Sequence, residues 1–164
     1  ARENKVPFLG ICLGLQCAVI DFARNVCGMK YANSTEFDSK TPYPVVDLME
    51  SQRAIKIKGG TMRLGAYDCQ ILVGTKAYSS YKKKKVSERH RHRYEVNNRY
   101  RKKLEKNGLI FSGINERLGV IETIELPNHP WYVASQFHPE LKSRVDKAHP
   151  LFRDFIKASV KQKL

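Results

Sequence analysis

The stretch at residues 6–16, VPFLGICLGLQ, indicates how this chain begins to fold. An apolar run enters the pattern G-x-C-x-G and a helical pattern follows it, so Cys12 is predicted to lie on a tight turn between a strand and a helix. Such a turn favours small neighbours, here Gly10 and Gly14. A helix N-terminus lowers the pKa of a nearby thiol and favours the thiolate. The pattern therefore indicates either a reactive cysteine or an ordinary turn that contains a buried one.

The composition indicates one globular domain. The 164 residues are 41% hydrophobic and 28% charged, with a mean hydropathy of -0.50, which favours a folded chain over a disordered one. No apolar run approaches the roughly 20 residues needed to span a bilayer, and no secretory signal is apparent. We therefore expect a cytoplasmic protein without membrane contact. The chain begins with Ala1 and runs directly into a strand, so we expect a fragment whose upstream strand or strands are missing.

The cysteines form neither a metal-binding nor a disulfide pattern. None makes a C-x-x-C pair and their spacing suits no common zinc site, so no metal is expected. Nothing indicates the oxidising compartment that disulfides need. Cys17, Cys27 and Cys69 are therefore expected to be small buried hydrophobic residues.

Most of the net charge of +14 lies in residues 76–106, which hold thirteen lysines and arginines against three glutamates. Such density is typical of a nucleic-acid-binding surface. It is also compatible with a solvated helix face that follows a flexible basic loop, or with a surface that meets an acidic partner domain or an anionic nucleotide. The run KKKK at 82–85 is interpreted as a solvated loop.

Hydrophobic periodicity predicts an alternation of strands and helices. Strands are expected at 6–11, 44–49, 109–112, 120–126 and 131–137, and helices at 14–26, 97–106 and 151–161. A turn at Gly59 and Gly60 is expected to open a β-ribbon over 61–76 that Gly65 interrupts. This order favours an α/β domain with an added antiparallel part.

A thiol nucleophile needs a base, and the chain has five histidines to supply it. His138 is favoured because it follows the apolar run WYVASQF, and strand ends are where α/β folds carry their chemistry. Glu140 could orient its imidazole, although a surface H-P-E turn is the alternative. Of the other four, His90 and His92 are expected to face solvent or a partner, His129 to lie in a turn between prolines, and His149 to precede a helix.

Two motifs together, GICLGLQ at 10–16 and SQFHPE at 135–140, resemble those of the class I glutamine amidotransferases, whose triad is Cys–His–Glu. KGGTMRLG at 58–65, SERHRHRYEVN at 87–97 and LPNHPWYVASQFHPE at 126–140 resemble the CTP-forming branch of that family, and the resemblance covers essentially the whole chain. In that branch a glutaminase domain passes ammonia to a synthase domain that aminates UTP to CTP with ATP. The fold that this implies is a mostly parallel α/β sheet flanked by helices, with flavodoxin-like layering.

The resemblance implies a catalytic triad. Cys12 would attack the side-chain amide of glutamine to form a γ-glutamyl thioester. His138 would take the thiol proton, protonate the departing ammonia and later activate water, and Glu140 would orient His138.

The resemblance also implies the contacts with glutamine. The backbone N–H of Leu13 would be one oxyanion donor. Gln16 and Glu36 match positions that bind the amino-acid end of the substrate, and Arg93 matches the arginine for the α-carboxylate. Because Arg93 belongs to the basic segment, the resemblance disfavours the nucleic-acid interpretation.

Two parts of such an enzyme are not found in the sequence, so residues 1–164 are interpreted as a partial amidotransferase domain. The glycine-rich loop that supplies the second oxyanion donor does not precede residue 6, and no synthase domain is present. This domain is expected to need no cofactor, whereas the full enzyme is expected to use ATP and Mg²⁺, to be activated by GTP and to form a homotetramer. The fragment alone is expected to be weak or inactive.

Two alternatives remain open at this point. A stand-alone γ-glutamyl hydrolase would use the same triad without a synthase partner. A basic nucleic-acid-binding module would bind in a strongly salt-dependent way and would not need Cys12.

Overall fold

The computed structural model describes residues 1–48 and 62–163, and in this part of the chain the strands form two sheets. The larger sheet has six strands, in the order β1 (Phe8–Ile11), β9 (Tyr132–Ser135), β8 (Val120–Glu125), β7 (Ile110–Asn115), β4 (Arg63–Ile71) and β5 (Lys85–His92). The smaller sheet contains β2 (Ala32–Ser34), β3 (Tyr43–Leu48) and β6 (Tyr94–Val96), with β3 in the middle.

The expectation of a mostly parallel sheet is wrong. In the larger sheet β1 and β9 pair in parallel, and the other four neighbouring pairs are antiparallel. Only the short segments 116–119 and 126–131 join β7 to β8 and β8 to β9. A parallel crossover needs a dozen or more residues, so these strands return as antiparallel neighbours. The α/β class and the added antiparallel part are confirmed.

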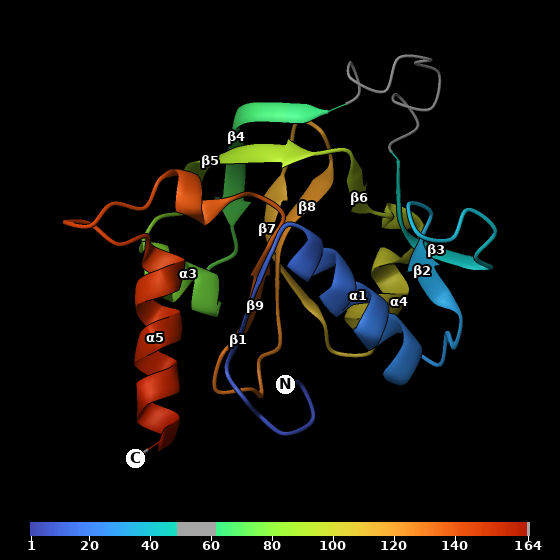
Figure 1. The fold of residues 1–164 in the computed structure, drawn as a ribbon, viewed down its shortest axis with the longest axis horizontal. Coiled ribbons are helices and arrows are strands. Elements are labelled where there is room, and N and C mark those ends of the chain that lie inside the picture. The colour runs from blue at the N-terminus through green and yellow to red at the C-terminus, as the bar shows by residue number, and fades with distance from the viewer. Residues whose placement is uncertain (49–61, 164) are drawn as a thin grey trace.

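Helices cover both faces of the larger sheet (Figure 1). Helix α1 (Leu13–Asn25) packs on one face and also reaches the smaller sheet, whereas α3 (Lys76–Tyr81) and α5 (Pro150–Lys163) lie together on the other. Side chains along a strand alternate between the two faces. On β9, accordingly, Tyr132 and Ala134 belong to the core beneath α1, and Val133 belongs to the core beneath α3 and α5.

The strands and helices expected from periodicity are all present, with ends shifted by a few residues. The expected helix at 97–106 is a 3₁₀ turn, η2 (Asn98–Tyr100), followed by α4 (Arg101–Lys106). Strands β2, β5 and β6 and helix α3 were not expected. The expectation that Gly65 interrupts the ribbon is wrong, because Gly65 lies inside β4, with a φ of 97°, and pairs with His90 of β5. The turn expected at Gly59 and Gly60 lies outside the described residues.

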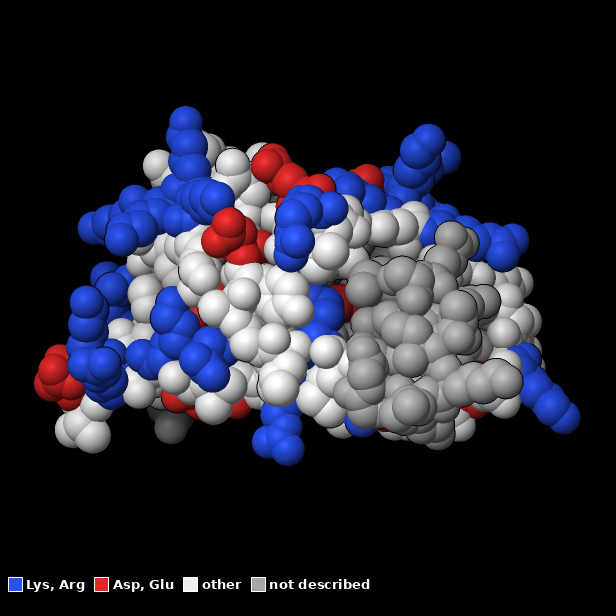
Figure 2. All heavy atoms as spheres, turned by 90° about the horizontal axis from the view of Figure 1, so that it is seen from above, with Lys and Arg blue, Asp and Glu red and all other residues white. Residues whose placement is uncertain are grey.

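The basic segment contains a strand where a helix face or a loop was expected. Along β5 the side chains of Glu88, His90 and His92 are buried, and those between them face outward. The expectation that His90 and His92 face solvent is therefore wrong, since every second side chain of this strand points into the core. Residues 82–84 precede the strand and are exposed. In Figure 2 the lysine and arginine side chains form several separate groups on the face that it shows.

The expectation for the three other cysteines is partly wrong. Cys27 and Cys69 are buried, but Cys17 is exposed, because it lies on the outer side of α1. In the part of the chain that the structure describes, no helix has the length and apolarity to cross a membrane, and no cluster of three or more His, Cys, Asp or Glu side chains could hold a metal ion.

Candidate active site

Cys12 is the single residue between β1 and α1, as the sequence predicted. Its φ of 51° and ψ of -101° are rare for a residue other than glycine, and such strain persists only where neighbouring contacts hold it. Its N–H donates to the carbonyl of Ser135 at 2.7 Å, and its carbonyl accepts from the N–H of Leu15 at 3.0 Å. The backbone of Cys12 is thus fixed both by β9 and by the first turn of α1.

The small residues of the motif have different roles. A Cβ on Gly10 would lie 2.8 Å from the Cβ of Ala134 and 2.8 Å from the carbonyl carbon of Gly14, so a side chain does not fit there. A Cβ on Gly14 would meet nothing within 4 Å. The expected need for a small residue is therefore confirmed at Gly10, and no such crowding exists at Gly14.

His138 lies at the same edge of the sheet as Cys12. Since β1 and β9 run in parallel with Ile11 opposite Ser135, the chain leaves both strands on the same side. The N–H of His138 donates to the carbonyl of Arg89 in β5 at 2.8 Å, and the turn η3 (Pro139–Leu141) follows. Cys12 and His138 are thus carried by neighbouring parallel strands.

Glu140 holds one nitrogen of His138. The Nδ1 of His138 lies 2.6 Å from Oε1 of Glu140, which assigns the Nδ1 proton to this hydrogen bond. The Nε2 of His138 is buried and has no hydrogen-bond partner among the described residues. The nitrogen that Glu140 does not hold is therefore the one available to act as a general base.

Burial dominates the environment of the Cys12 thiol. Burial raises the pKa of Cys12, while the backbone N–H of Leu13 and the side-chain amide of Gln136 lower it, and the negative charges of Glu95 and Glu140 raise it further. The Nε2 of Gln136 lies 3.7 Å from Sγ. A thiol pKa lowered by the helix N-terminus was expected. The N–H at the start of α1 acts in that direction, but burial outweighs it, so the net shift of the thiol pKa is upward.

The residues expected on the substrate side are linked through Tyr94, which the sequence did not indicate as part of a glutamine site. Gln16 is buried and donates from Nε2 to the carbonyl of Tyr94 at 3.0 Å, and its Oε1 has no partner among the residues described. Burial and the charges of Glu36 and Asp47 raise the pKa of Tyr94, and the charge of Arg93 lowers it. Glu36 is exposed and Arg93 half-buried.

A model of the family described as Glutamine amidotransferase class-I matches residues 1–158. The chain belongs to this family. It is 61% identical over 164 residues to the CTP synthase of Caldanaerobacter subterraneus subsp. tengcongensis, and the aligned region covers 100% of this chain and 30% of that protein. It is 61% identical over 159 residues to the CTP synthase of Pelodictyon phaeoclathratiforme, and that aligned region covers 97% of this chain and 28% of that protein.

Among solved structures, the chain is similar to the glutaminase domain of Trypanosoma brucei CTPS with bound acivicin. The TM-score is 0.91 at 38% sequence identity, over 98% of this chain and 62% of that one. This amidotransferase domain is thus similar to the glutaminase domain of CTP synthases. It spans about 30% of the length of the curated relatives that it matches.

Beneath the amidotransferase site lies a buried group of charges that sequence reasoning also missed. Arg63 of β4 donates to Glu95 of β6 at 2.8 Å and to Glu122 of β8 at 2.7 Å. His92 lies 2.7 Å from Glu95, and His90 lies 3.4 Å from Glu122. Through Arg63 the group ties the smaller sheet to the larger one. The only sequence signal was the alternation of Glu and His with basic residues at 88–92.

Two members of this charge group have strongly shifted pKa values. Burial raises the pKa of Glu122 to about 7 even though Arg63 lowers it, and burial together with the charge of Arg63 lowers the pKa of His90 to about 2. Arg63 carries one positive charge against the negative charges of Glu95 and Glu122. A proton on Glu122 removes that excess of negative charge, and burial also favours the protonated form.

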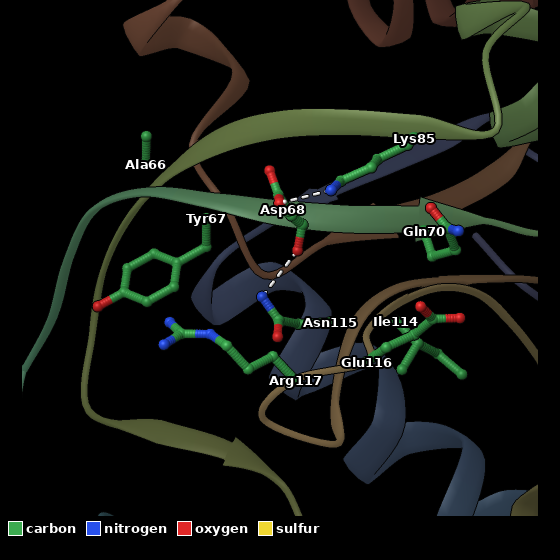
Figure 3. A pocket seen from close by; sticks show the side chains of 9 residues that line it. All are labelled: Ala66, Tyr67, Asp68, Gln70, Lys85, Ile114, Asn115, Glu116 and Arg117. Atoms are coloured by element: carbon green, nitrogen blue, oxygen red, sulfur yellow. Dashed lines mark hydrogen bonds and ion pairs between the residues drawn. The ribbon is translucent and has the colours of Figure 1, made fainter.

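A hollow on the outside of the sheet is separate from this site (Figure 3). It lies against β4, β5 and the end of β7, and neither Cys12 nor His138 lines it. Asp68 pairs with Lys85 at 2.8 Å, and Asn115 donates to the backbone carbonyl of Asp68 at 2.7 Å. Three polar residues of its wall, Asp68, Lys85 and Asn115, are thus engaged with one another, away from the thiol.

Proposed function

We propose that the chain is the glutaminase domain of a CTP-forming synthase and that Cys12, His138 and Glu140 hydrolyse L-glutamine. One observation carries the proposal. His138 is held at Nδ1 by Glu140 at 2.6 Å, and its buried Nε2 is left without a partner among the described residues, on the segment that follows the strand beside Cys12. A thiol nucleophile needs such a base.

The acylation step begins with the transfer of the Cys12 thiol proton to Nε2 of His138. The sulfur forms a bond to the side-chain carbonyl carbon of glutamine, and the carbonyl oxygen becomes an oxyanion. As this intermediate collapses, the C–N bond breaks and His138 returns the proton to the departing ammonia. Glu140 accepts the Nδ1–H hydrogen bond throughout and stabilises the imidazolium. The product on the enzyme is a γ-glutamyl thioester.

Deacylation uses the same groups in reverse. His138 takes a proton from water, and the resulting oxygen nucleophile attacks the thioester carbon. The C–S bond breaks, glutamate leaves and the thiol of Cys12 is restored. We propose that the backbone N–H of Leu13, which lowers the pKa of Cys12, donates to the oxyanion in both steps. We place the second donor on a glycine-rich loop upstream in the complete polypeptide.

The substrate-binding side is formed by Gln16, Glu36 and Arg93, each of which is linked to Tyr94. We propose that Arg93 binds the α-carboxylate of glutamine and Glu36 the α-ammonium, since each offers the opposite charge. Gln16 has a buried Oε1 without a partner among the described residues, and we assign it to the same end of the substrate. These residues come from the segment after β2, from α1 and from the link between β5 and β6.

The ammonia is proposed to serve a synthase domain of the same polypeptide, which aminates UTP to CTP with ATP and Mg²⁺ in the cytoplasm. Identity to CTP synthases along the whole chain, together with the coverage of about 30% of their length, supports this assignment. The full enzyme is proposed to be a GTP-activated homotetramer, and the 164 residues to be a partial amidotransferase domain of it.

The test is made on the full-length polypeptide with Cys12→Ala, and Cys17→Ala serves as the matched control because Cys17 is exposed on the same helix. CTP formation from UTP and ATP is measured with glutamine and with ammonium chloride. We expect Cys12→Ala to abolish the glutamine reaction and to leave the ammonium reaction intact, whereas Cys17→Ala leaves both. If Cys12→Ala still uses glutamine, the assignment of the nucleophile is wrong.

A further inference from the structure

The His138–Glu140 pair lies on the segment between β9 and α5, and its position depends on what anchors that segment. Strand β9 ends at Ser135 and helix α5 begins at Pro150. Between them, the short turn η3 is closed by its own hydrogen bonds, from Leu141 N–H to the carbonyl of His138 at 3.1 Å and from Lys142 N–H to that of Pro139 at 3.1 Å. These bonds shape the turn but do not attach it to the sheet.

Strand β5 supplies the attachment from His138 onward, whereas the N–H of Gln136, just before it, donates to the carbonyl of Glu122 in β8 at 2.8 Å. The carbonyl of Arg89 accepts from the N–H of His138 at 2.8 Å, and the carbonyl of Ser87 accepts from Nζ of Lys142. In Figure 1 the segment after β9 runs beside β5 and then leads down into α5, with α3 next to it. The residue between the two carbonyl acceptors is Glu88, whose side chain points inward and is only 2% exposed.

Glu88 is the centre of a second buried polar group, outside the site described above. Its Oε1 accepts from the hydroxyl of Tyr81, at the end of α3, at 2.9 Å. The same oxygen lies 3.1 Å from Nε2 of His149, the residue before α5. Because Nδ1 of His149 accepts the N–H of Leu151 at 3.3 Å, the ring proton lies on Nε2 and is donated to Glu88. Both donors converge on one carboxylate oxygen.

The other oxygen of Glu88 faces the catalytic segment. Its Oε2 is buried, and Nζ of Lys142 lies 3.7 Å from it. Lys142 is half-exposed and comes directly after η3, whereas His149 comes directly before α5. One carboxylate on β5 therefore lies within ion-pair distance of both ends of the connection 142–149, which the N–H of His149 also joins by donating to Oγ of Ser143 at 3.1 Å. A buried carboxylate is stable only while such partners remain, so the contacts stand or fall together.

We propose that Glu88 is a positioning residue for glutamine hydrolysis, acting through Lys142 and His149 to hold the His138–Glu140 segment against β5. This inference rests on the proposed function. Glu88 is not assigned a contact with glutamine, since the substrate-side residues gather at Tyr94 and Glu88 is enclosed between β5, α3 and the start of α5. Its effect is on the alignment of His138 with the thiol, and misplacement of a catalytic group by about 1 Å can cost on the order of 100-fold in rate.

The experiment uses the full-length polypeptide with Glu88→Gln and Lys142→Met, and steady-state glutamine hydrolysis is measured over a range of glutamine concentrations. Glu88→Gln keeps the volume and one oxygen that can accept from Tyr81 and His149, but it turns an NH₂ group toward Nζ of Lys142 and removes the negative charge. Lys142→Met removes the cation and leaves Glu88 with Tyr81 and His149. Lys142→Arg tests rescue by a retained charge. Lys147→Met is the matched control, because Lys147 is exposed in the same connection and its side chain makes no ion pair or hydrogen bond among the described residues.

We expect Glu88→Gln to lower kcat about 10- to 100-fold and Lys142→Met to lower it less, both with the KM for glutamine changed less than about threefold. Lys142→Arg should recover most of the loss, and Lys147→Met should match the parent protein. If Glu88→Gln fails to fold, Lys142→Met decides alone. An unchanged kcat in Lys142→Met, or a rise in KM without a fall in kcat, overturns the proposal.

The outcome is separable from that of the proposed function. If Cys12→Ala abolishes glutamine hydrolysis while Glu88→Gln and Lys142→Met leave kcat unchanged, only the positioning role is wrong. If Cys12→Ala leaves glutamine hydrolysis intact, the proposed function itself is wrong, whatever the Glu88 variants show.

Discussion

Gly10 and Ala134 face each other across the parallel pair β1–β9, and a Cβ on Gly10 would lie 2.8 Å from the Cβ of Ala134. Two residues further along, Cys12 takes its strained conformation with a φ of 51°. The close approach of the two strands at Gly10 therefore sets the backbone from which the thiol projects. A side chain at Gly10 must separate β1 from β9 or from the first turn of α1, and either movement displaces Cys12.

Gly10→Ala is expected to lower the free energy of unfolding by about 1–3 kcal/mol, the usual cost of overpacking. The measurement is thermal or denaturant unfolding of the parent and variant proteins. Gly14→Ala is the control, since a Cβ there meets nothing within 4 Å and alanine is favoured in a helix by roughly 0.5–1 kcal/mol. If both substitutions destabilise equally, the contact with Ala134 is not what restricts Gly10.

Gln136→Leu is expected to raise the pKa of the Cys12 thiol further. Burial already raises this pKa, and the side-chain amide of Gln136, 3.7 Å from Sγ, is one of the groups that lower it. The rate of alkylation of Cys12 by iodoacetamide, followed against pH by mass spectrometry of the peptide, reports the thiolate fraction. The parent profile should have its midpoint above the usual value of about 8.5, and the variant profile should lie higher still. A midpoint that does not move in the variant would contradict the role given to this amide.

The sequence predicted the parts of this fold that depend on local periodicity. The turn at Cys12, the helix after it and the apolar strands at 120–126 and 131–137 all follow from short-range pattern. It did not predict α3, because that six-residue helix depends on a distant residue: the Glu125 carboxylate of β8 accepts from the N–H groups of Lys76 and Ala77 at 2.9 and 3.1 Å. Tertiary contacts of this kind leave no mark on local propensity.

The candidate site likewise contains residues that local pattern reveals and residues that only tertiary contacts place. Cys12 and His138 stand out because each is attached to an apolar strand pattern. The polar groups at Tyr94 and Arg63 do not, since whether a charged residue is buried depends on the register of its strand. His90 and Arg91 are adjacent on β5, yet the first is buried and the second is exposed. The parallel sheet was also wrongly expected, because strand direction is not written in the strand sequences: short connections force β7–β8 and β8–β9 to be antiparallel, and β4 and β5 are antiparallel although 72–84, with α3, join them.

Arg93→Met is expected to raise the KM for glutamine at least about tenfold while lowering kcat much less, because a contact with the α-carboxylate contributes to binding of substrate and transition state alike. The KM of Arg93→Lys should lie between those of the parent protein and Arg93→Met, since an ammonium keeps the charge but cannot pair with the carboxylate through two parallel hydrogen bonds. Arg99→Met, on the exposed turn η2, is the control. Steady-state kinetics of glutamine hydrolysis separate the constants. A fall in kcat at constant KM would place Arg93 with the reacting atoms instead.

Glu122→Gln is expected to change how stability depends on pH. Burial raises the pKa of Glu122 to about 7 in the folded protein, against about 4.5 for the free group. A group with a raised pKa binds its proton more tightly when folded, so its stabilising contribution is complete below about pH 4.5 and is lost as the pH rises through about 7. In that interval the parent protein should lose stability relative to Glu122→Gln, whose amide does not titrate. Thermal unfolding of both proteins at half-unit pH steps measures the difference. A constant difference in melting temperature between pH 4.5 and 7 would show that Arg63 keeps Glu122 ionised throughout.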